Sequence, residues 1–280
     1  MKNKHKIFSR LSAKPTFINA IILKSVVFCF EIRWFDIVSC FLDESYTKLK
    51  PENAELKISC VVTFSDIRRF YLLKEAIQSI KNQTYSNYEI IIVDGTSQLG
   101  ESRERLMGMY DDRFLIEPYK SSSPGDARNF GSQFATGDIL IFLDDDNLFV
   151  PFYFQQLATW YTFNPKVDVA LFRFIIIEGD FIYDVPISRK YSRSLLFKRN
   201  PSDTNVMSFK IHNGNLPKWA VNTLHEDWIL LKESELNNLV IKSVNNLAVL
   251  YRKHNLNRTN PKSSYFHSKW FKRIDFRKNN

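Results

Sequence analysis

The chain has 280 residues, of which 44% are hydrophobic and 25% charged, a composition typical of a globular protein with a large core and unlike that of a disordered chain. Eight Gly and ten Pro against 24 Phe and 12 Tyr exclude collagen-like and low-complexity sequence. The net charge is +9, and the three cysteines have neither the spacing of a zinc site nor that of a disulfide framework, which fits a reducing cytoplasm.

Residues 1–55 form an N-terminal extension that we expect to be helical. Residues 17–42 are rich in Ile, Val, Phe and Trp, but four charged residues interrupt them: Lys24, Glu31, Arg33 and Asp36. No uninterrupted run of about 20 apolar residues is left to span a membrane, and no clean secretory cleavage site follows. We therefore expect one or two helices that pack on the main domain or rest on the bilayer. A polar stretch over 48–57 separates them from a main domain over 56–255.

The main domain begins with the pattern of a βαβ unit. The β-branched run 58–64 predicts a buried strand, apolar residues at helical spacing predict a helix over 71–82, and 88–94 predicts a second buried strand that ends in Asp94. A strand, a helix and a strand within about 35 residues are typical of parallel strands joined by a crossover. A nucleotide would bind at the carboxyl ends of these strands.

The same pattern continues through the rest of the domain. Residues 126–135 predict a helix, and 138–143 predict a third buried strand that brings three consecutive aspartates to the same sheet edge. A polar, irregular stretch over 187–218 is either a loop beside the site or a sign of elements that the pattern does not reveal. The further elements expected are helices over 151–161 and 227–239 and strands over 167–177, 181–185 and 247–251.

The aspartate cluster is the first candidate for chemistry. Like charges this close raise one another's pKa, and a divalent cation would remove that cost. On an extended chain Asp144 and Asp146 point to one side while Asp145 faces away, so the first and third carboxylates would share a ligand. Oxygen ligands favour Mg²⁺ or Mn²⁺ over zinc. The alternative is an exposed acidic turn or the start of a helix.

Four motifs between residues 91 and 146 carry a resemblance to a known family. They are Ile91-Ile92-Val93-Asp94-Gly95, Gly125-Asp126-Ala127-Arg128-Asn129-Phe130-Gly131, Thr136-Gly137-Asp138 and Leu143-Asp144-Asp145-Asp146. In order and spacing they resemble the nucleotide-binding half of the family 2 glycosyltransferases, and the resemblance spans most of residues 56–255. It implies the α/β GT-A fold, with a single mixed, mostly parallel sheet flanked by helices.

The resemblance also implies how a nucleotide-sugar donor would be held. Asp94 would bind the nucleobase, Asp144 would lie near the ribose or the metal, and Asp146 would coordinate the Mn²⁺ or Mg²⁺ that bridges the diphosphate. Arg128 would lie close to the phosphates, which suits a guanidinium that stays charged; alternatively it pairs with Asp126 or Asp138 on the surface. The complete set of residues implied to bind the sugar donor is Thr63, Phe64, Asp94, Arg128, Asp144 and Asp145.

Two segments further along complete the implied site. His225-Glu226-Asp227-Trp228 resembles the family's Glu-Asp segment, in which the second acid is the catalytic base of inverting members, so Asp227 is the candidate base. Asp227 could instead be only a favourable charge at a helix start. His254 is the candidate third metal ligand, and His225 is its competitor.

The sequence therefore predicts a metal-dependent, inverting glycosyltransferase that moves a sugar from a UDP-linked donor to a glycan or lipid-linked acceptor in cell-surface polysaccharide synthesis. The alternatives are a sugar-1-phosphate nucleotidyltransferase, an inactive donor-binding protein and a nucleic-acid-binding protein, although we expect no nucleic-acid partner. Residues 251–280 hold nine Lys or Arg against one acid, interleaved with aromatic residues in the tail 256–280. This tail is either solvated or attached to an anionic membrane, so we expect a cytoplasmic protein, peripheral on the inner face of the membrane.

Overall fold

A computed structural model describes residues 55–96, 99–106, 111–178, 181–184, 191–212 and 214–254. The helices expected in the N-terminal extension and the basic aromatic tail lie outside the described residues. Within the described part of the chain, no helix is long and apolar enough to cross a membrane.

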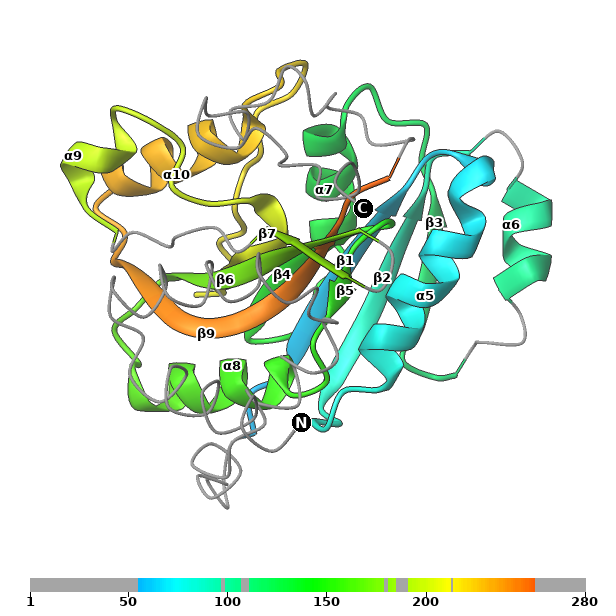
Figure 1. Ribbon diagram of the computed structural model, residues 1–280, viewed down its shortest axis with the longest axis horizontal. Coiled ribbons are helices and arrows are strands. Elements are labelled where there is room, and N and C mark those ends of the chain that lie inside the picture. The colour runs from blue at the N-terminus through cyan, green and yellow to red at the C-terminus, as the bar shows by residue number, and fades with distance from the viewer. Residues whose placement is uncertain are drawn as a thin grey trace, which may run out of the picture.

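The structure is built on one mixed sheet of nine strands, in the order β3-β2-β1-β4-β8-β6-β9-β5, with β7 paired to β6 (Figure 1). The strands are β1 Ile58–Phe64, β2 Tyr88–Asp94, β3 Phe114–Pro118, β4 Ile139–Asp144, β5 Leu148–Phe149, β6 Val169–Glu178, β7 Phe181–Asp184, β8 Met207–Lys210 and β9 Ile241–Arg252. The helices are α5 Phe70–Lys81, α6 Leu99–Leu106, α7 Pro124–Ser132, α8 Tyr153–Phe163, α9 Arg193–Leu196 and α10 Glu226–Leu236, with short 3-10 turns η1 Ile67–Arg69 and η3 Thr204–Val206.

Parallel pairing sets the position of the site. Strand β1 pairs in parallel with both β2 and β4, which confirms the predicted βαβ unit. In this register Phe64 lies beside Asp94, and Thr63 lies beside Asp144. The carboxyl ends of three strands, and with them two of the predicted acids, therefore meet at one edge of the sheet.

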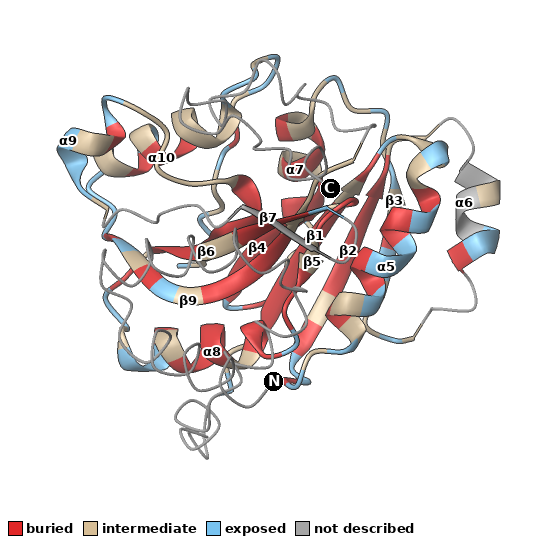
Figure 2. Ribbon diagram, in the orientation of Figure 1, coloured by how far each residue is buried: buried red, intermediate tan, exposed pale blue. Residues whose placement is uncertain are grey.

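Both faces of the sheet are covered, as the uninterrupted apolar runs of its central strands require. Helices α5 and α8 pack on one face and α7 and α10 on the other (Figure 1). The central strands β1, β2 and β4 are almost entirely buried between these layers (Figure 2). Cys60 is fully buried among apolar side chains, and burial raises the pKa of its thiol.

The irregular stretch predicted over 187–218 contains elements that the sequence pattern did not reveal. Strand β8 is only four residues long, and it is buried because it lies between β4 and β6 and pairs antiparallel with both. Helix α9 and the η3 turn precede it. Strands β3 and β5 and helix α6 were also missed, and the last strand, β9, begins at Ile241, earlier than predicted. Strands β5 and β8 are short, and the strands that pair with them are distant in sequence.

Candidate active site at the carboxyl edge of the sheet

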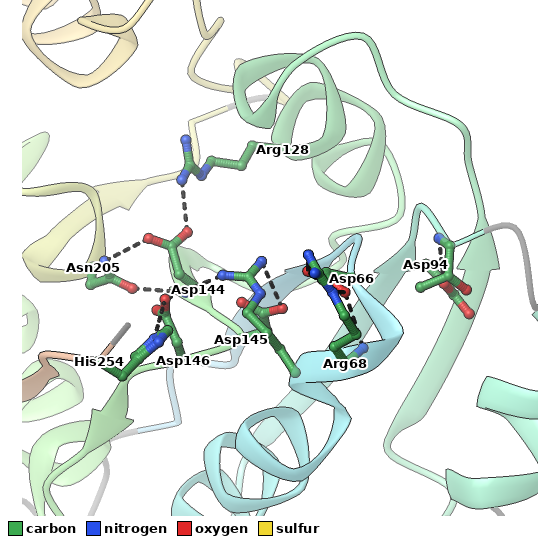
Figure 3. A network of polar contacts seen from close by, with 11 residues as sticks. Asp66, Arg68, Asp94, Arg128, Asp144, Asp145, Asp146, Asn205 and His254 are labelled. Atoms are coloured by element: carbon green, nitrogen blue, oxygen red, sulfur yellow. Dashed lines mark hydrogen bonds and ion pairs between the residues drawn. The ribbon is translucent and has the colours of Figure 1, made fainter. Parts of the chain in front are cut away.

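The three aspartates diverge. Strand β4 ends at Asp144, and the chain turns at Asp145 and Asp146. Asp144 points toward Arg128 and Asn205 (Figure 3), whereas Asp145 and Asp146 both pair with Arg69. The expectation that Asp145 faces away from Asp146 is therefore wrong, because the alternation of an extended strand stops at Asp144.

Asp145 and Asp146 share the guanidinium of Arg69, which comes from the η1 turn after β1. Arg69 Nη2 lies 3.1 Å from Asp145 Oδ2, and Nη1 lies 3.3 Å from Asp146 Oδ2. The Asp145 side chain is 1% exposed, and its Oδ2 makes no hydrogen bond of good geometry within the described structure. Burial raises the pKa of Asp145 well above its usual value, against the opposing charge of Arg69.

Asp144 is held by two neighbours, one charged and one neutral. Arg128 Nη2 donates to Asp144 Oδ1 at 2.7 Å, and Asn205 Nδ2 donates to Oδ2 at 3.0 Å. Asn205 also accepts from the backbone N–H of Asp144 at 2.7 Å. Burial pushes the pKa of Asp144 upward, but the charge and hydrogen bond of Arg128 and the bond from Asn205 bring it below its ordinary value. The carboxyl group is thus ionised and fixed in direction.

Arg128 connects two distant parts of the site. Its guanidinium pairs with Asp144 and, at 3.3 Å, with Glu226 at the start of α10, and it lies 4.8 Å from the centre of the Trp219 ring. The side chain is 5% exposed. The surface alternative for Arg128 is wrong, because Asp126 and Asp138 bond other residues. In this structure Arg128 faces the carboxylates of Asp144 and Glu226, and its approach to the phosphates of a sugar donor stays a prediction.

Two residues of the motif around Arg128, Gly125 and Asn129, fix the loop that leads to α10. A Cβ on Gly125 would lie 2.2 Å from the carbonyl oxygen of Ala220, so only glycine lets the loop before α10 approach α7 this closely. Asn129 then bonds the backbone of Trp219 twice, donating to its carbonyl at 2.9 Å and accepting from its N–H at 2.8 Å. The motif therefore fixes the path of the chain toward Glu226 and Asp227.

His254 is brought to Asp146 by the end of β9. The backbone N–H of Arg252 donates to Asn147 Oδ1 at 2.9 Å, which ties the strand end to the turn after β4. His254 Nε2 lies 3.1 Å from Asp146 Oδ2 (Figure 3). The competing histidine, His225, packs edge-on against the Trp228 ring. Of the two candidate histidines, the structure thus places His254 beside the acid cluster.

Asp94 is the last residue of β2, and its two carboxylate oxygens have different surroundings. Oδ1 accepts from the backbone N–H of Thr96 at 2.8 Å, whereas Oδ2 is buried without a hydrogen-bond partner among the described residues. Thr63 is partly buried at the end of β1 beside Asp144. The Phe64 side chain is 2% exposed and packs against Phe70, so Phe64 could contact a ligand only through its backbone.

Asp227 lies on the first turn of α10, where sequence analysis placed it. Asn200 Nδ2 donates to its Oδ2 at 2.7 Å, and the net effect of its surroundings, led by burial, raises the pKa of Asp227. A further acid, Asp203, accepts from the backbone and side-chain N–H groups of Asn205 at 3.0 and 2.7 Å. Burial, followed by the charge of Asp144, raises the pKa of Asp203 to about 7. Sequence analysis missed Asn200, Asp203 and Asn205, whose polar stretch had no pattern to distinguish it from a loop.

Comparison with known proteins identifies the family. The model described as "Glycosyl transferase family 2" matches residues 61–226, which is more than half of the chain. The chain belongs to glycosyl transferase family 2. This assignment confirms the resemblance in the motifs and sets aside the nucleotidyltransferase alternative. The matched range covers Asp94, Arg128 and the aspartate cluster, and it ends at Glu226, beside the candidate base.

Two curated relatives match part of the family 2 domain. The glucosyl-dolichyl phosphate glucuronosyltransferase of Haloferax volcanii is 29% identical over 111 residues, 39% of this chain and 36% of the relative. The uncharacterized glycosyltransferase YwdF of Bacillus subtilis is 35% identical over 105 residues, 37% of each chain. The alignments thus span little more than a third of the length of these relatives.

Solved structures confirm the GT-A fold. The S. aureus TarS fragment 1-349 in complex with UDP-GlcNAc is similar with a TM-score of 0.58 and 17% identity, over 75% of this chain and 62% of that one. GalNAc-T7 with UDP, GalNAc and Mn²⁺ is similar with a TM-score of 0.53 and 14% identity, over 71% and 44% of the two chains. At these identities the likeness shows the fold alone.

The family 2 site offers two ligand atoms for a divalent cation. Asp146 Oδ2 and His254 Nε2 lie 3.1 Å apart, and neighbouring ligands of an octahedral ion at about 2.1 Å are separated by about 3 Å, so the pair fits such an ion. Among the described residues, no group of three or more His, Cys, Asp or Glu is placed to hold a metal. The remaining positions would fall to phosphate oxygens and water, as is usual for Mg²⁺-type sites.

Proposed function

We propose that this family 2 chain is an inverting glycosyltransferase that uses a UDP-linked sugar and a divalent cation, Mn²⁺ or Mg²⁺. The observation that carries the proposal is the meeting of three features at one sheet edge. They are a buried acid with an unsatisfied oxygen, a carboxylate paired with a histidine, and a carboxylate of raised pKa on the facing helix: Asp94, Asp146 with His254, and Asp227.

The sugar donor would be held at the ends of β1, β2 and β4. Asp94 Oδ2 would accept a hydrogen bond from an N–H of the nucleobase, which satisfies an oxygen that is buried without a partner among the described residues. A divalent cation held by Asp146 and His254 would neutralise charge on the departing diphosphate. The structures of TarS with UDP-GlcNAc and of GalNAc-T7 with UDP and Mn²⁺ support this choice of nucleotide and metal.

Asp227 would act as the base that takes the proton from the acceptor hydroxyl. A general base works best when its pKa is not far below the working pH, and the surroundings of Asp227 raise its pKa in that direction. Asn200 would keep the carboxyl group turned in a fixed direction through its 2.7 Å hydrogen bond. Arg128 would serve as a positioning residue, because it holds Asp144 on the donor side and Glu226 next to the base.

For the acceptor we propose a glycan or a lipid-linked sugar of cell-surface polysaccharide synthesis, reached at the inner face of the membrane. The similarity to an enzyme named for a dolichyl phosphate substrate supports a lipid-linked acceptor. The basic aromatic residues 256–280 have the composition of a segment that binds an anionic surface. The division into an extension over 1–55, a catalytic domain over 56–255 and this tail is part of the proposal.

The test combines binding and turnover on the intact chain. Calorimetry with UDP, GDP and CDP, with and without Mn²⁺, should show metal-dependent binding of UDP that Asp146→Ala abolishes. A matched control, Asp111→Ala, removes a carboxylate paired with Arg113 at the start of β3 and should leave binding intact. Asp227→Asn should retain UDP binding but lose transfer to the acceptor. Full transfer by Asp227→Asn would contradict the assignment of the base, and the absence of binding to any nucleotide would contradict the proposal as a whole.

A further inference from the structure

Two consecutive arginines after β1 have opposite environments. The Arg69 side chain is 16% exposed and contacts both Asp145 and Asp146. The Arg68 side chain is 74% exposed and pairs with Asp66, away from the cluster (Figure 3). The chain thus places one of two neighbouring guanidinium groups on the acidic turn and leaves the other at the surface.

The contact of Arg69 falls on the same atom that would bind a cation. Asp146 Oδ2 lies 3.3 Å from Arg69 Nη1 and 3.1 Å from His254 Nε2. A guanidinium remains charged at every working pH, so it is a permanent positive neighbour of this oxygen. A divalent cation placed beside Asp146 would meet the repulsion of Arg69 and would compete with it for the carboxylate oxygen.

Asp145 makes the position of Arg69 stable without metal. Its carboxyl group is 1% exposed, and Arg69 is the one cation paired with it among the described residues. Removing a buried carboxylate's only positive neighbour is costly, so Asp145 holds Arg69 on the turn. Arg69 therefore offsets part of the negative charge of the turn, independently of any bound ion.

We propose that Arg69 is an internal counter-cation that competes with the divalent cation for Asp146 and so keeps cation affinity low until the nucleotide diphosphate binds. The inference rests on the metal site of the proposed function. The diphosphate supplies further oxygen ligands and negative charge, which would shift the competition in favour of the metal. Metal and nucleotide would then strengthen each other's binding, as linkage requires.

The test is titration of the intact chain with Mn²⁺ alone, followed by the electron paramagnetic resonance signal of free Mn²⁺. Arg69→Met should bind Mn²⁺ about tenfold more tightly than the wild type, as expected when one charge-assisted contact to the ligand oxygen is removed. Arg68→Met removes the same charge one residue away and should change the affinity less than about twofold, because exposed charges are screened. Arg69→Lys, which keeps the charge, should stay near the wild-type value.

The direction of the change in Mn²⁺ affinity tests the inference. If Arg69 only supports the fold, Arg69→Met should weaken Mn²⁺ binding or leave it unchanged, and either result would overturn the proposal. An equal gain in Arg68→Met would overturn it too, because the effect would then be one of net charge. The gain should disappear in the double variant Arg69→Met with Asp146→Asn, which shows that the ion binds at Asp146.

The same titration separates this inference from the proposed function. A gain of Mn²⁺ affinity in Arg69→Met without UDP binding by any variant would support the competition and contradict the transferase proposal. UDP binding that needs Mn²⁺, with no gain in Arg69→Met, would support the transferase proposal and overturn the competition. If Arg69→Met fails to fold, as thermal unfolding would show, the comparison of Arg69→Gln with Arg68→Gln replaces it.

Discussion

Asp203 should make the folded protein less stable as the pH rises through neutrality. Burial and the charge of Asp144 raise the pKa of the Asp203 carboxyl group to about 7 in the folded chain, whereas an unfolded aspartate titrates near a pKa of about 3.9. Between these values the folded state keeps a proton that the unfolded state has lost. Stability therefore falls as the pH rises from about 4 to about 7.

The replacement Asp203→Asn isolates this effect. An asparagine stays neutral at every pH, and its oxygen can still accept the two N–H groups of Asn205 that Asp203 Oδ1 accepts, at 3.0 and 2.7 Å. The pKa difference of about three corresponds to a gain of about 4 kcal/mol in the free energy of unfolding at pH 8, with little change at pH 4. With a urea m-value of about 2–3 kcal/mol/M, the unfolding midpoint should rise by about 1–2 M at pH 8.

Urea unfolding of both proteins at pH 4, 6 and 8, followed by circular dichroism, measures this difference. Asp111→Asn is the control with the opposite sign, because the hydrogen bond from Arg113 lowers the pKa of Asp111 and its loss should destabilise the protein slightly above pH 4. If Asp203→Asn changes stability equally at all three pH values, the carboxyl group does not titrate as argued.

Two further substitutions test the packing of the site. Arg128→Met should lower the free energy of unfolding by about 3–5 kcal/mol in urea titrations, because it leaves two carboxylates without their buried partner. The control Arg113→Met, at a more exposed ion pair, should lower it by less than about 1 kcal/mol. Equal losses in the two variants would contradict the role of burial. Gly125→Ala should lower it by about 1–3 kcal/mol, since the new Cβ would meet the Ala220 carbonyl at 2.2 Å, and unchanged stability would show that this loop can move away freely.

The parallel half of the sheet could be predicted because its sequence signals are local. The strand over 58–64, the helix after it and the strand over 88–94 each have a continuous apolar run or a clear helical period, and the structure has β1, α5 and β2 there. Parallel strands joined by a helix place their carboxyl ends at one edge, so the meeting of Asp94 with the aspartate cluster also followed from the pattern.

The antiparallel half could not be predicted because its elements depend on distant partners. Strand β8 is four residues long and owes its burial to β4 and β6. The polar residues just before it are typical of a solvated loop in sequence. Yet Asn205 donates to Asp144, 61 positions away, and Asn200 donates to Asp227, 27 positions away. Only the folded sheet brings these groups together.

The predicted orientation of the Asp145 side chain was wrong for a related reason. Alternation of side chains holds only while the backbone is extended, and the sequence Leu143-Asp144-Asp145-Asp146 does not show where the strand stops. The structure ends β4 at Asp144 and turns there, so Asp145 and Asp146 face the same arginine. The resemblance to the family indicated which residues gather at the site, but the local turn decided which way each carboxylate points.

The charges at the site explain why protons and cations would act there as alternatives. The guanidinium groups of Arg69 and Arg128 face six carboxyl groups, and each guanidinium already pairs with two of these carboxylates. Burial is the main reason why the pKa values of Asp145, Asp203 and Asp227 are raised, and the charges of neighbouring acids add to it. A divalent cation adds positive charge without adding a side chain, so its arrival would favour ionisation of these acids and make Asp227 a weaker base. The acids concerned are Asp144, Asp145, Asp146, Asp203, Glu226 and Asp227.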